Sequence, residues 1–405
     1  MISRRELILE LVRRYGSPLY VFDQAAFVQN YNRLTDAFRR YYETYSIAYS
    51  FKTNYTPYIA GLVEKLGGFG EVVSGMEYEI AKRVGFPDNR ILFNGPNKGQ
   101  AGIDALFRGC LVHVDNLTEL EAVCQAAESR PDRKFEIALR VNVDVGQRFV
   151  SRFGLDPDEL PAAFHMTAQV PNLRVAGLHC HISRCRGLDA WIRRAANMLE
   201  LADRYFDTPP EYIDLGSGMF GAMDPEFAAQ FDNVPTYDEY AQAVGGLFAR
   251  HYENCPVKPM LLTEPGTTLI NKYVDFIGRV DAMKQIRGKQ FAILDCSAHN
   301  LGETCTLKEL PMSVVPMGEQ RHCEDLDFTG YTCLEQDVMH RHYTGPLAVG
   351  DYIVFGNVGG YSNVLKPPFI APNCAMVALC PDGGTRVIKR KETFMDLLGT
   401  YAFPE

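Results

Sequence analysis

A lysine lies where a buried strand is expected to end. The run SIAYSFKTNYTPY, residues 46–58, begins with β-branched and aromatic residues and places Lys52 just before a predicted helix. An ammonium group there loses its hydration unless it is neutral, paired or covalently engaged. A lysine with a lowered pKa can form a Schiff base with an aldehyde. The alternative is that Lys52 only extends along apolar surface to reach water.

Two further stretches follow predicted strands with groups that suit a charged aromatic ring. In TEPG, Glu264 supplies a carboxylate, which beside a pyridine nitrogen would keep that nitrogen protonated and the ring electron-withdrawing. In GLHCHIS, His181 supplies a flat imidazole that could stack on such a ring. The structural alternatives are a carboxylate paired with a core base and a buried histidine with satisfied nitrogens.

Three other motifs are compatible with anion binding or proton transfer. The turn DLGSGMFG contains Gly216, Ser217 and Gly218, whose backbone N–H groups could approach an anion, although a purely structural turn has the same pattern. Cys333 in GYTCLEQD could act on a proton or be an inert buried thiol. Tyr361 in VGGYSN could reach a phosphate with its hydroxyl or pack within a loop.

The segment HCHISRC could also suggest zinc, with His179, His181 and Cys185 as ligands. The two histidines share a face of a strand only if that strand is regular. No second cysteine pair completes a tetrahedral set. We therefore expect no metal.

The elements that carry these residues alternate between short apolar runs and helical patterns. The predicted strands are 46–51, 71–73, 91–94, 111–114, 136–143, 174–182, 211–215 and 260–264. Helical stretches lie between them at 76–84, 100–108, 117–127 and 190–205. This alternation predicts an α/β fold with a parallel sheet, closed as a (β/α)8 barrel whose strand ends meet at one mouth. The alternative is an open doubly wound sheet.

The pattern changes after about residue 270, where helical periodicity is scarce and strand-like runs recur. We expect strands at 273–280, 291–294, 351–355, 375–379 and 387–389. The sequence therefore predicts a barrel domain at 25–270 and an all-β domain at 271–405. Residues 1–24, which contain an amphipathic helix and a strand at 19–22, are expected to join the β-domain.

Composition limits the classes of function. The net charge of −9 argues against a nucleic-acid protein, and no stretch has the apolar length of a membrane span. The 11 cysteines form no CxxC pair and no secretion signal is recognisable, which favours reduced thiols in the cytoplasm.

Taken in order, the motifs resemble those of the fold-type III pyridoxal-phosphate decarboxylases, the diaminopimelate and ornithine decarboxylase family. The matching segments, which cover almost the whole chain, are YSFKTN, EVVSGMEYEIA, RVNVDV, SRFGL, GLHCHIS, DLGSG, TEPG, GYTCLEQD and GDYIVFGNVGGY. The resemblance implies an alanine-racemase-like (β/α)8 barrel with a C-terminal all-β domain. It also implies pyridoxal 5′-phosphate (PLP) as cofactor and a head-to-tail homodimer with shared active sites.

The resemblance also implies roles for individual residues. Lys52 would hold the cofactor as an aldimine, His181 would stack on its ring, and Glu264 would pair with its pyridine nitrogen. Cys333, from the neighbouring subunit, would handle the proton that replaces carbon dioxide. The implied cofactor-binding residues are Lys52, His181, Ser183, Gly216, Ser217, Gly218, Glu264 and Tyr361. The substrate candidates are Asp295, Glu303 and Glu335.

Several positions depart from the family pattern. The family has Gly-Ser where this chain has Ser183-Arg184, and three glycines where it has Gly216-Ser217-Gly218. The arginine that follows Glu-Pro-Gly in the family is Thr267 here. An ungapped reading places Glu303 at a second family arginine, and Leu334 at the glutamate that follows the catalytic cysteine.

Those arginines read the distal carboxylate of meso-diaminopimelate in family members that use it. We therefore expect an amino-acid decarboxylase acting at the α-carbon of another diamino acid or of a carboxylated siderophore, polyamine or natural-product precursor. The alternatives are a diaminopimelate decarboxylase of lysine biosynthesis, an amino-acid racemase on the same barrel and a non-catalytic PLP-binding homologue.

Overall fold

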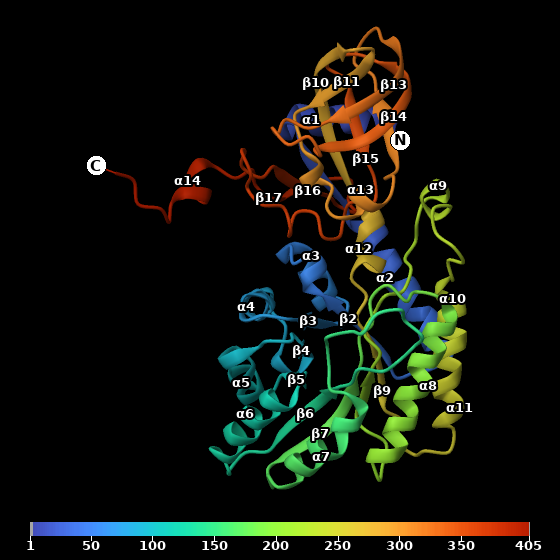
Figure 1. Cartoon of the computed structure of the whole chain (residues 1–405), viewed down its shortest axis with the longest axis vertical. Coiled ribbons are helices and arrows are strands. Elements are labelled where there is room, and N and C mark those ends of the chain that lie inside the picture. The colour runs from blue at the N-terminus through green and yellow to red at the C-terminus, as the bar shows by residue number, and fades with distance from the viewer. Residues whose placement is uncertain (1–2, 405) are drawn as a thin grey trace. The chain divides into compact units, whose positions relative to one another are not determined.

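The computed structural model describes residues 3–404 and divides the chain into two compact units (Figure 1). The barrel unit contains Asn30–Gly221 and Asn233–Thr268. The β unit contains the N-terminal segment up to Gln29, the segment Ala222–Asp232 and the chain from Leu269 onward. The β unit is thus assembled from three separate stretches of sequence.

Eight parallel strands close the barrel, as the alternating pattern predicts. They are β2 (Tyr45–Ser50), β3 (Phe69–Val72), β4 (Ile91–Phe93), β5 (Leu111–Val114), β6 (Phe135–Arg140), β7 (Leu173–His179), β8 (Tyr212–Asp214) and β9 (Met260–Thr263). The first strand pairs with the last, with Tyr45 opposite Leu261. This closure confirms the barrel and excludes the open sheet.

Helices follow most barrel strands and cover their outer faces (Figure 1). They are α3 (Pro57–Lys65), α4 (Gly75–Val84), α5 (Gly99–Arg108), α6 (Leu117–Glu128), α7 (Leu160–Ala168), α8 (Leu188–Tyr205), α10 (Tyr237–Tyr240) and α11 (Gly246–His251). Local sequence sets their ends. Ser74 accepts a hydrogen bond from the Glu77 N–H at the start of α4, and left-handed Gly85 ends that helix.

The two faces of the barrel wall are packed differently. Inside, a buried cluster is formed by Ala48, Phe69, Leu92, Ala138, Tyr212 and Leu262. Outside, Trp191 of α8 is fully buried, and its ring meets that of Tyr240 in α10 edge-on with 5.6 Å between centroids. This contact joins α8 to α10.

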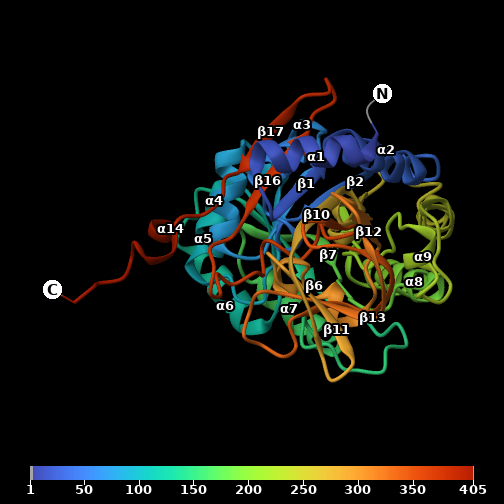
Figure 2. The ribbon, with the colours of Figure 1, turned by 90° about the horizontal axis from the view of Figure 1, so that it is seen from above.

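The β unit contains a nine-stranded sheet into which the N-terminal strand is inserted. Its main path runs β14–β13–β11–β10–β1–β16–β17, while β15 pairs with β10 and β12. The strands are β1 (Leu19–Asp23), β10 (Val274–Ile286), β11 (Lys289–Leu294), β12 (Met312–Val315), β13 (Arg321–Thr329), β14 (Val338–Leu347), β15 (Tyr352–Phe355), β16 (Ala375–Leu379) and β17 (Thr385–Lys389). Figure 2 shows β1 beside β16, with which it pairs in parallel.

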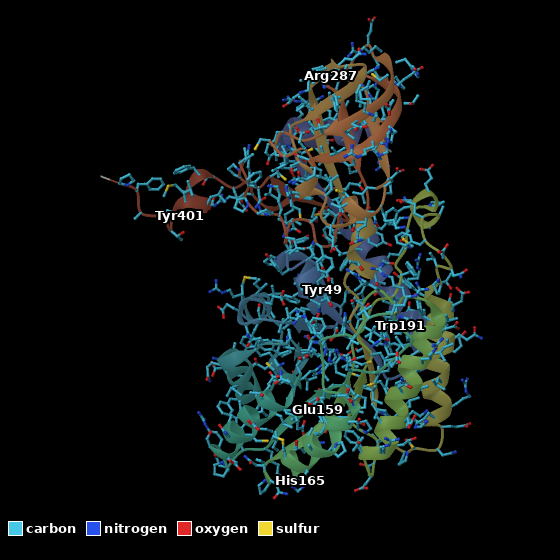
Figure 3. All side chains as sticks on the ribbon, viewed as in Figure 1. Tyr49, Glu159, His165, Trp191, Arg287 and Tyr401 are labelled. Carbon is cyan, nitrogen blue, oxygen red and sulfur yellow. The ribbon has the colours of Figure 1, made fainter. Side chains whose placement is uncertain are left out.

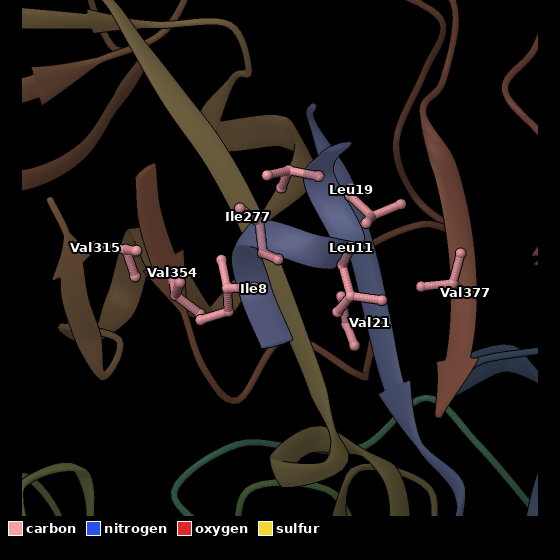
Figure 4. Close-up of a cluster of buried hydrophobic side chains, with 9 residues drawn as sticks. Ile8, Leu11, Leu19, Val21, Ile277, Val315, Val354 and Val377 are labelled. Carbon is pink, nitrogen blue, oxygen red and sulfur yellow. The ribbon is translucent and has the colours of Figure 1, made fainter. Parts of the chain in front are cut away.

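Helix α1 (Arg4–Tyr15) packs on this sheet through its apolar face (Figure 4). Ile8 and Leu11 lie against Leu19 and Val21 of β1 and Ile277 of β10. A capping box fixes the start of the helix, because Ser3 and Glu6 satisfy each other's backbone N–H groups. The amphipathic N-terminal segment thus folds as part of the β unit's core.

The remaining elements are short or join the two units. They are α2 (Gln24–Arg39), α9 (Pro225–Ala228), α12 (Thr267–Ile270), α13 (Thr304–Leu307) and α14 (Phe394–Leu398). Within residues 3–404, no helix has the length and apolar character needed to cross a bilayer.

Candidate active site

Four of the predicted site segments meet at one end of the barrel. Lys52 lies in a 3-10 turn, Phe51–Thr53, that directly follows β2. His181, the turn 216–218 and Glu264 follow β7, β8 and β9, and those three strands and β2 are successive neighbours in the barrel. Parallel strands place all these ends at the same mouth. The barrel thus brings together residues that are up to about 210 positions apart in the sequence, Lys52 and Glu264.

Lys52 is partly exposed and has an anionic partner at the mouth. Its Nζ contacts both carboxylate oxygens of Glu71, which projects from β3 and is fully buried, and lies 3.4 Å from Ser50 Oγ. Burial raises the pKa of Glu71, as does the nearby charge of Glu264, whereas Lys52 opposes both effects. Glu71 therefore orients the amine and can exchange a proton with it.

Glu264 is the most heavily engaged carboxylate of the site. Its Oε2 accepts a 3.0 Å hydrogen bond from His181 Nδ1, its Oε1 lies 3.3 Å from His179 Nε2, and Asn94 donates its amide N–H to Oε1. Burial would raise the pKa of Glu264, but these polar contacts hold it well below its usual range. Glu264 is therefore an anion at neutral pH.

The two histidines that contact Glu264 are neutral. Burial lowers the pKa of His179, and it lowers the pKa of His181 to about 4 even though Glu264 opposes the shift. A carboxylate only accepts hydrogen bonds, so His181 carries its proton on Nδ1. The nearby His179 ring, hydrogen bonds from His181 and Asn94, and the charge of Lys52 thus stabilise the Glu264 anion.

A second buried layer lies beneath Glu264 and was not predicted from the sequence. The His113 and His179 rings are 4.7 Å apart between centroids, and both residues are completely buried. Burial and the neighbouring Glu264 raise the pKa of Asp214 well above its usual range. Polar atoms of His113, His179, Asp214 and Glu264 lie within 4.8 Å of one another. His179 therefore faces the barrel core rather than Cys185.

The turn after β8 is held against the segment after β7. The Gly216 N–H donates to Asp214 Oδ1 at 2.8 Å, and the Gly216 carbonyl accepts from the Glu264 N–H at 2.8 Å. Gly216 has φ +61°, and a Cβ on it would lie 2.5 Å from the Cys180 carbonyl oxygen. Only glycine fits this position without moving the backbone.

This turn leaves backbone donors unused. Among residues 3–404, the N–H groups of Gly218 and Ser183 donate no hydrogen bond. The Ser217 N–H lies 3.3 Å from His181 Nδ1, and Ser183 is exposed. Backbone N–H groups left free in this way, one after β7 and one after β8, can bind an anion.

The part of the mouth formed by the ends of β5 and β6 contains a buried ion pair. Arg140 Nη1 donates to Asp115 Oδ1 at 3.0 Å, and Asp115 also accepts from the Gly154 N–H at 3.2 Å. The Arg140 guanidinium lies 4.8 Å from the centroid of the Phe153 ring. Asn94 and Asp115 were recognisable as polar strand ends, whereas Glu71 and Arg140 lie within apolar runs that give no such signal.

The other predicted residues lie in the β unit. Cys333 and Glu335 are exposed in the loop between β13 and β14, and Glu303 is exposed just before α13. Asp295 follows β11, where its Oδ1 accepts a 2.8 Å hydrogen bond from the Arg279 N–H. Tyr361 is partly buried and has φ +54°. The structure thus separates these five residues from the barrel set by unit.

Comparisons with known proteins match the whole chain. The family model described as "Pyridoxal-dependent decarboxylase, pyridoxal binding domain" matches residues 27–271. The diaminopimelate decarboxylase of Methanocaldococcus jannaschii is 26% identical over 98% of this chain and 93% of its own length. That of Aquifex aeolicus is 25% identical over 95% and 91%.

A solved structure shares the fold as well. The crystal structure of diaminopimelate decarboxylase from M. jannaschii superposes with a TM-score of 0.87 at 25% identity, covering 98% of this chain and 94% of that one. The family model alone spans more than half of the chain and contains every strand of the barrel. The chain therefore belongs to the pyridoxal-dependent decarboxylases, PLP-dependent enzymes that release the carboxylate of an amino acid as carbon dioxide.

Proposed function

We propose that this decarboxylase acts on diaminopimelate and releases lysine. The observation that carries the proposal is the full-length similarity to proteins named diaminopimelate decarboxylase. It favours the alternative stated from the sequence over the expectation of another diamino acid. The described residues at the barrel mouth supply the groups that the reaction requires.

The residues present fit the phosphate and the ring of PLP. The unused N–H groups of Gly218 and Ser183 suit a phosphate, and a Cβ at Gly216 or Gly218 would crowd that turn. The anionic Glu264 suits a protonated pyridine nitrogen. His181 would lie against the ring, Lys52 would bind the aldehyde carbon, and Tyr361 would add a phosphate contact.

When bound, PLP withdraws the electron pair that is left on the α-carbon after carbon dioxide departs. The protein residues support this chemistry by holding charge in place. Glu264 remains an anion because Asn94, His179 and His181 surround it, and it does not have to gain or lose a proton. Glu71 holds the Lys52 amine at the mouth and can take a proton from it.

We assign the final proton transfer to Cys333 of a neighbouring copy in a homodimer with shared sites. Cys333 is exposed and lies in the β unit, whereas Lys52 lies in the barrel unit. An exposed thiol at a loop tip can reach a site on another chain and donate a proton there. The cysteines of both units are thiols rather than disulfides, which supports a reducing, cytoplasmic location.

A specific observation favours a second candidate, a diamino acid without a distal carboxylate or a larger conjugate. The position that follows Glu264-Pro265-Gly266 is Thr267, and Glu303 is an exposed anion where the family has a cation. An unpaired carboxylate in a desolvated site costs about 3–5 kcal/mol. Under this second candidate Glu335 or Asp295 would bind a distal ammonium instead.

One panel of substrates separates these possibilities. Carbon dioxide release is measured for meso-diaminopimelate, L-lysine, L-ornithine and a citrate-conjugated diamino acid, with Lys52→Ala as the inactive control. The proposal predicts the highest kcat/KM for meso-diaminopimelate. A higher value for another member of the panel would establish the second candidate. Interconversion of stereoisomers without carbon dioxide release would instead identify a racemase.

A further inference from the structure

A buried arginine without a carboxylate partner lies behind the glycine turn. Arg194 belongs to α8, one turn after Trp191, which Figure 3 labels. Its side chain is fully buried, and none of the ion pairs among residues 3–404 includes it. Its guanidinium lies 4.3 Å from the centroid of the Trp191 ring. A charge in such a place needs polar neighbours that repay its lost hydration.

Three backbone carbonyls supply that compensation. Arg194 Nη1 donates to the carbonyls of Leu215 and Ser217, at 2.8 Å each, and Nη2 donates to the carbonyl of Ile182 at 2.9 Å. One planar guanidinium therefore ties the segment after β7 to the turn after β8. Arginine is suited to this because its donors lie in a rigid fork.

These contacts also determine where the backbone N–H groups point. In a trans peptide the C=O and the following N–H point in opposite directions. Holding the three carbonyls toward α8 therefore directs the N–H groups of Ser183, Gly216 and Gly218 to the other side. The Gly216 N–H is used by Asp214 Oδ1. The other two are the donors that have no acceptor among the described residues.

We propose that Arg194 is a positioning residue that sets the affinity for the phosphate of PLP, by locking the carbonyls of Ile182, Leu215 and Ser217 and placing an unpaired positive charge behind the anion site. This inference rests on the proposed placement of the phosphate at the turn 216–218. The inference concerns the phosphate and not the ring of PLP. Arg194 donates to the carbonyls of Ile182, Leu215 and Ser217, and none of these residues contacts the side chain of Glu264. Burial shields the charge from water and so increases its effect on an anion.

The test measures phosphate recognition separately from folding and activity. Apoprotein is titrated with PLP and with pyridoxal, which lacks the phosphate, for wild type, Arg194→Met and Arg194→Lys. The chain's single tryptophan, Trp191, reports both titrations by its fluorescence. Arg204→Met is the matched control, because Arg204 lies on the same helix, is exposed and, among the residues that the structure describes, pairs only with Glu200.

We expect Arg194→Met to bind PLP about 10- to 100-fold more weakly, as for lost hydrogen bonds to a charged group. Pyridoxal affinity should change less than about 3-fold by the same arithmetic. Arg194→Lys should lose less PLP affinity than Arg194→Met, because it keeps the positive charge. It should still bind PLP more weakly than wild type, because an ammonium group cannot reach all three carbonyls. Inorganic phosphate should raise the Tm of wild-type apoprotein and of Arg204→Met, but not of Arg194→Met.

Equal losses for PLP and pyridoxal, or no loss, would overturn the inference. If wild-type apoprotein bound pyridoxal as tightly as PLP, the placement of the phosphate in the proposed function would be wrong instead. Should both Arg194 variants fail to fold, Gly218→Ala gives an independent test. Its Cβ would lie 2.9 Å from the Ile182 carbonyl oxygen and displace it from Arg194. The same selective loss of PLP affinity is expected there, and an unselective loss would overturn the inference.

Discussion

At the scale of single residues, the site is built from charges that are fixed by neutral neighbours. Glu264 stays ionised because His179 lies close to it and the His181 imidazole and the Asn94 amide donate to it, and the histidines stay neutral because they are buried. The cofactor's nitrogen would therefore meet an anion that no change of pH near neutrality removes. Lys52, in contrast, is paired with Glu71, whose own pKa is raised.

The first prediction concerns the lysine that carries the cofactor. Borohydride reduction of the PLP-loaded protein should fix the cofactor on the peptide that contains Lys52, because its amine lies at the barrel mouth. Peptide mass mapping locates the adduct. Lys52→Ala should give none, whereas Lys65→Ala, altered on the outer helix α3, should keep it. An adduct on any other lysine would contradict the assignment.

The second prediction concerns acid stability of the apoprotein. His181 has a folded pKa of about 4, below its unfolded value of about 6.5, so the unfolded state binds the proton first. Stability is therefore lost as pH falls through the window from about 6.5 to 4. Lowering the pH from 7.5 to 5 should cost about 2 kcal/mol through His181 alone.

Urea unfolding at both pH values measures this loss. His181→Asn should lose about 2 kcal/mol less over the same range, because no imidazole titrates there. His165→Asn is the matched control, since it makes the same substitution at an exposed position on α7 (Figure 3). A wild-type loss that persists in His181→Asn would assign it to other groups.

Individual site residues were predictable from the sequence only where a polar residue follows a run of apolar residues. Lys52, His181 and Glu264 stand out in that way, and the structure brings them to one mouth. Arg194 gave no such signal, because an arginine within an amphipathic helix has the pattern of a solvated face. Its acceptors are carbonyls from two distant turns, and those appear only after folding.

At the scale of elements, the glycine turn after β8 is a tightly constrained segment of the site. Gly216→Ala would place a Cβ 2.5 Å from the Cys180 carbonyl oxygen and 2.8 Å from His181 Nδ1. We predict a lower Tm together with loss of PLP affinity. Gly109→Ala is the control, because Gly109 also has positive φ, at +93°, but has open space around its Cβ position.

The control should lose about 1–2 kcal/mol of stability from backbone strain and keep its PLP affinity. Thermal unfolding and PLP titration of the two variants separate strain from steric displacement. If Gly216→Ala behaved like Gly109→Ala in both measurements, the close contacts around Gly216 would not determine PLP binding.

The elements themselves were predictable where periodicity was clear. All eight barrel strands correspond to predicted apolar runs. The bounds of barrel strand β5, 111–114, and of β16 in the β unit, 375–379, are the same in the prediction and in the structure. Strands β12, β13 and β14 were missed. The register of β13 with β14 is irregular, so the buried positions of β13 do not alternate. The sequence of β13 therefore lacks the period of two that predicts a strand.

At the scale of the whole molecule, the proposed homodimer makes a complementation prediction. Lys52→Ala and Cys333→Ala homodimers should each be inactive or nearly so. A mixed dimer regains one complete site, so an equal mixture should recover about a quarter of the wild-type activity. Activity assays after subunit exchange, with exchange verified by native mass spectrometry, measure this.

The control for that experiment mixes the Lys52→Ala chain with a Cys323→Ala chain in place of the Cys333→Ala chain. Cys323 is buried in β13, and its variant should be active before mixing. Absence of recovery despite complete exchange would mean that one chain must supply both residues, and this would argue against shared sites.

The position of β1 has a consequence for biosynthesis. One neighbour, β10, begins at Val274, and the other, β16, ends at Leu379. At about 5–20 residues per second, a ribosome needs roughly 20–70 s to make the chain between β1 and the end of β16. During that interval the barrel strands can already close, while β1 still lacks one or both partners. An unpaired strand edge invites mispairing, so nascent β1 is a segment for which chaperone protection would matter.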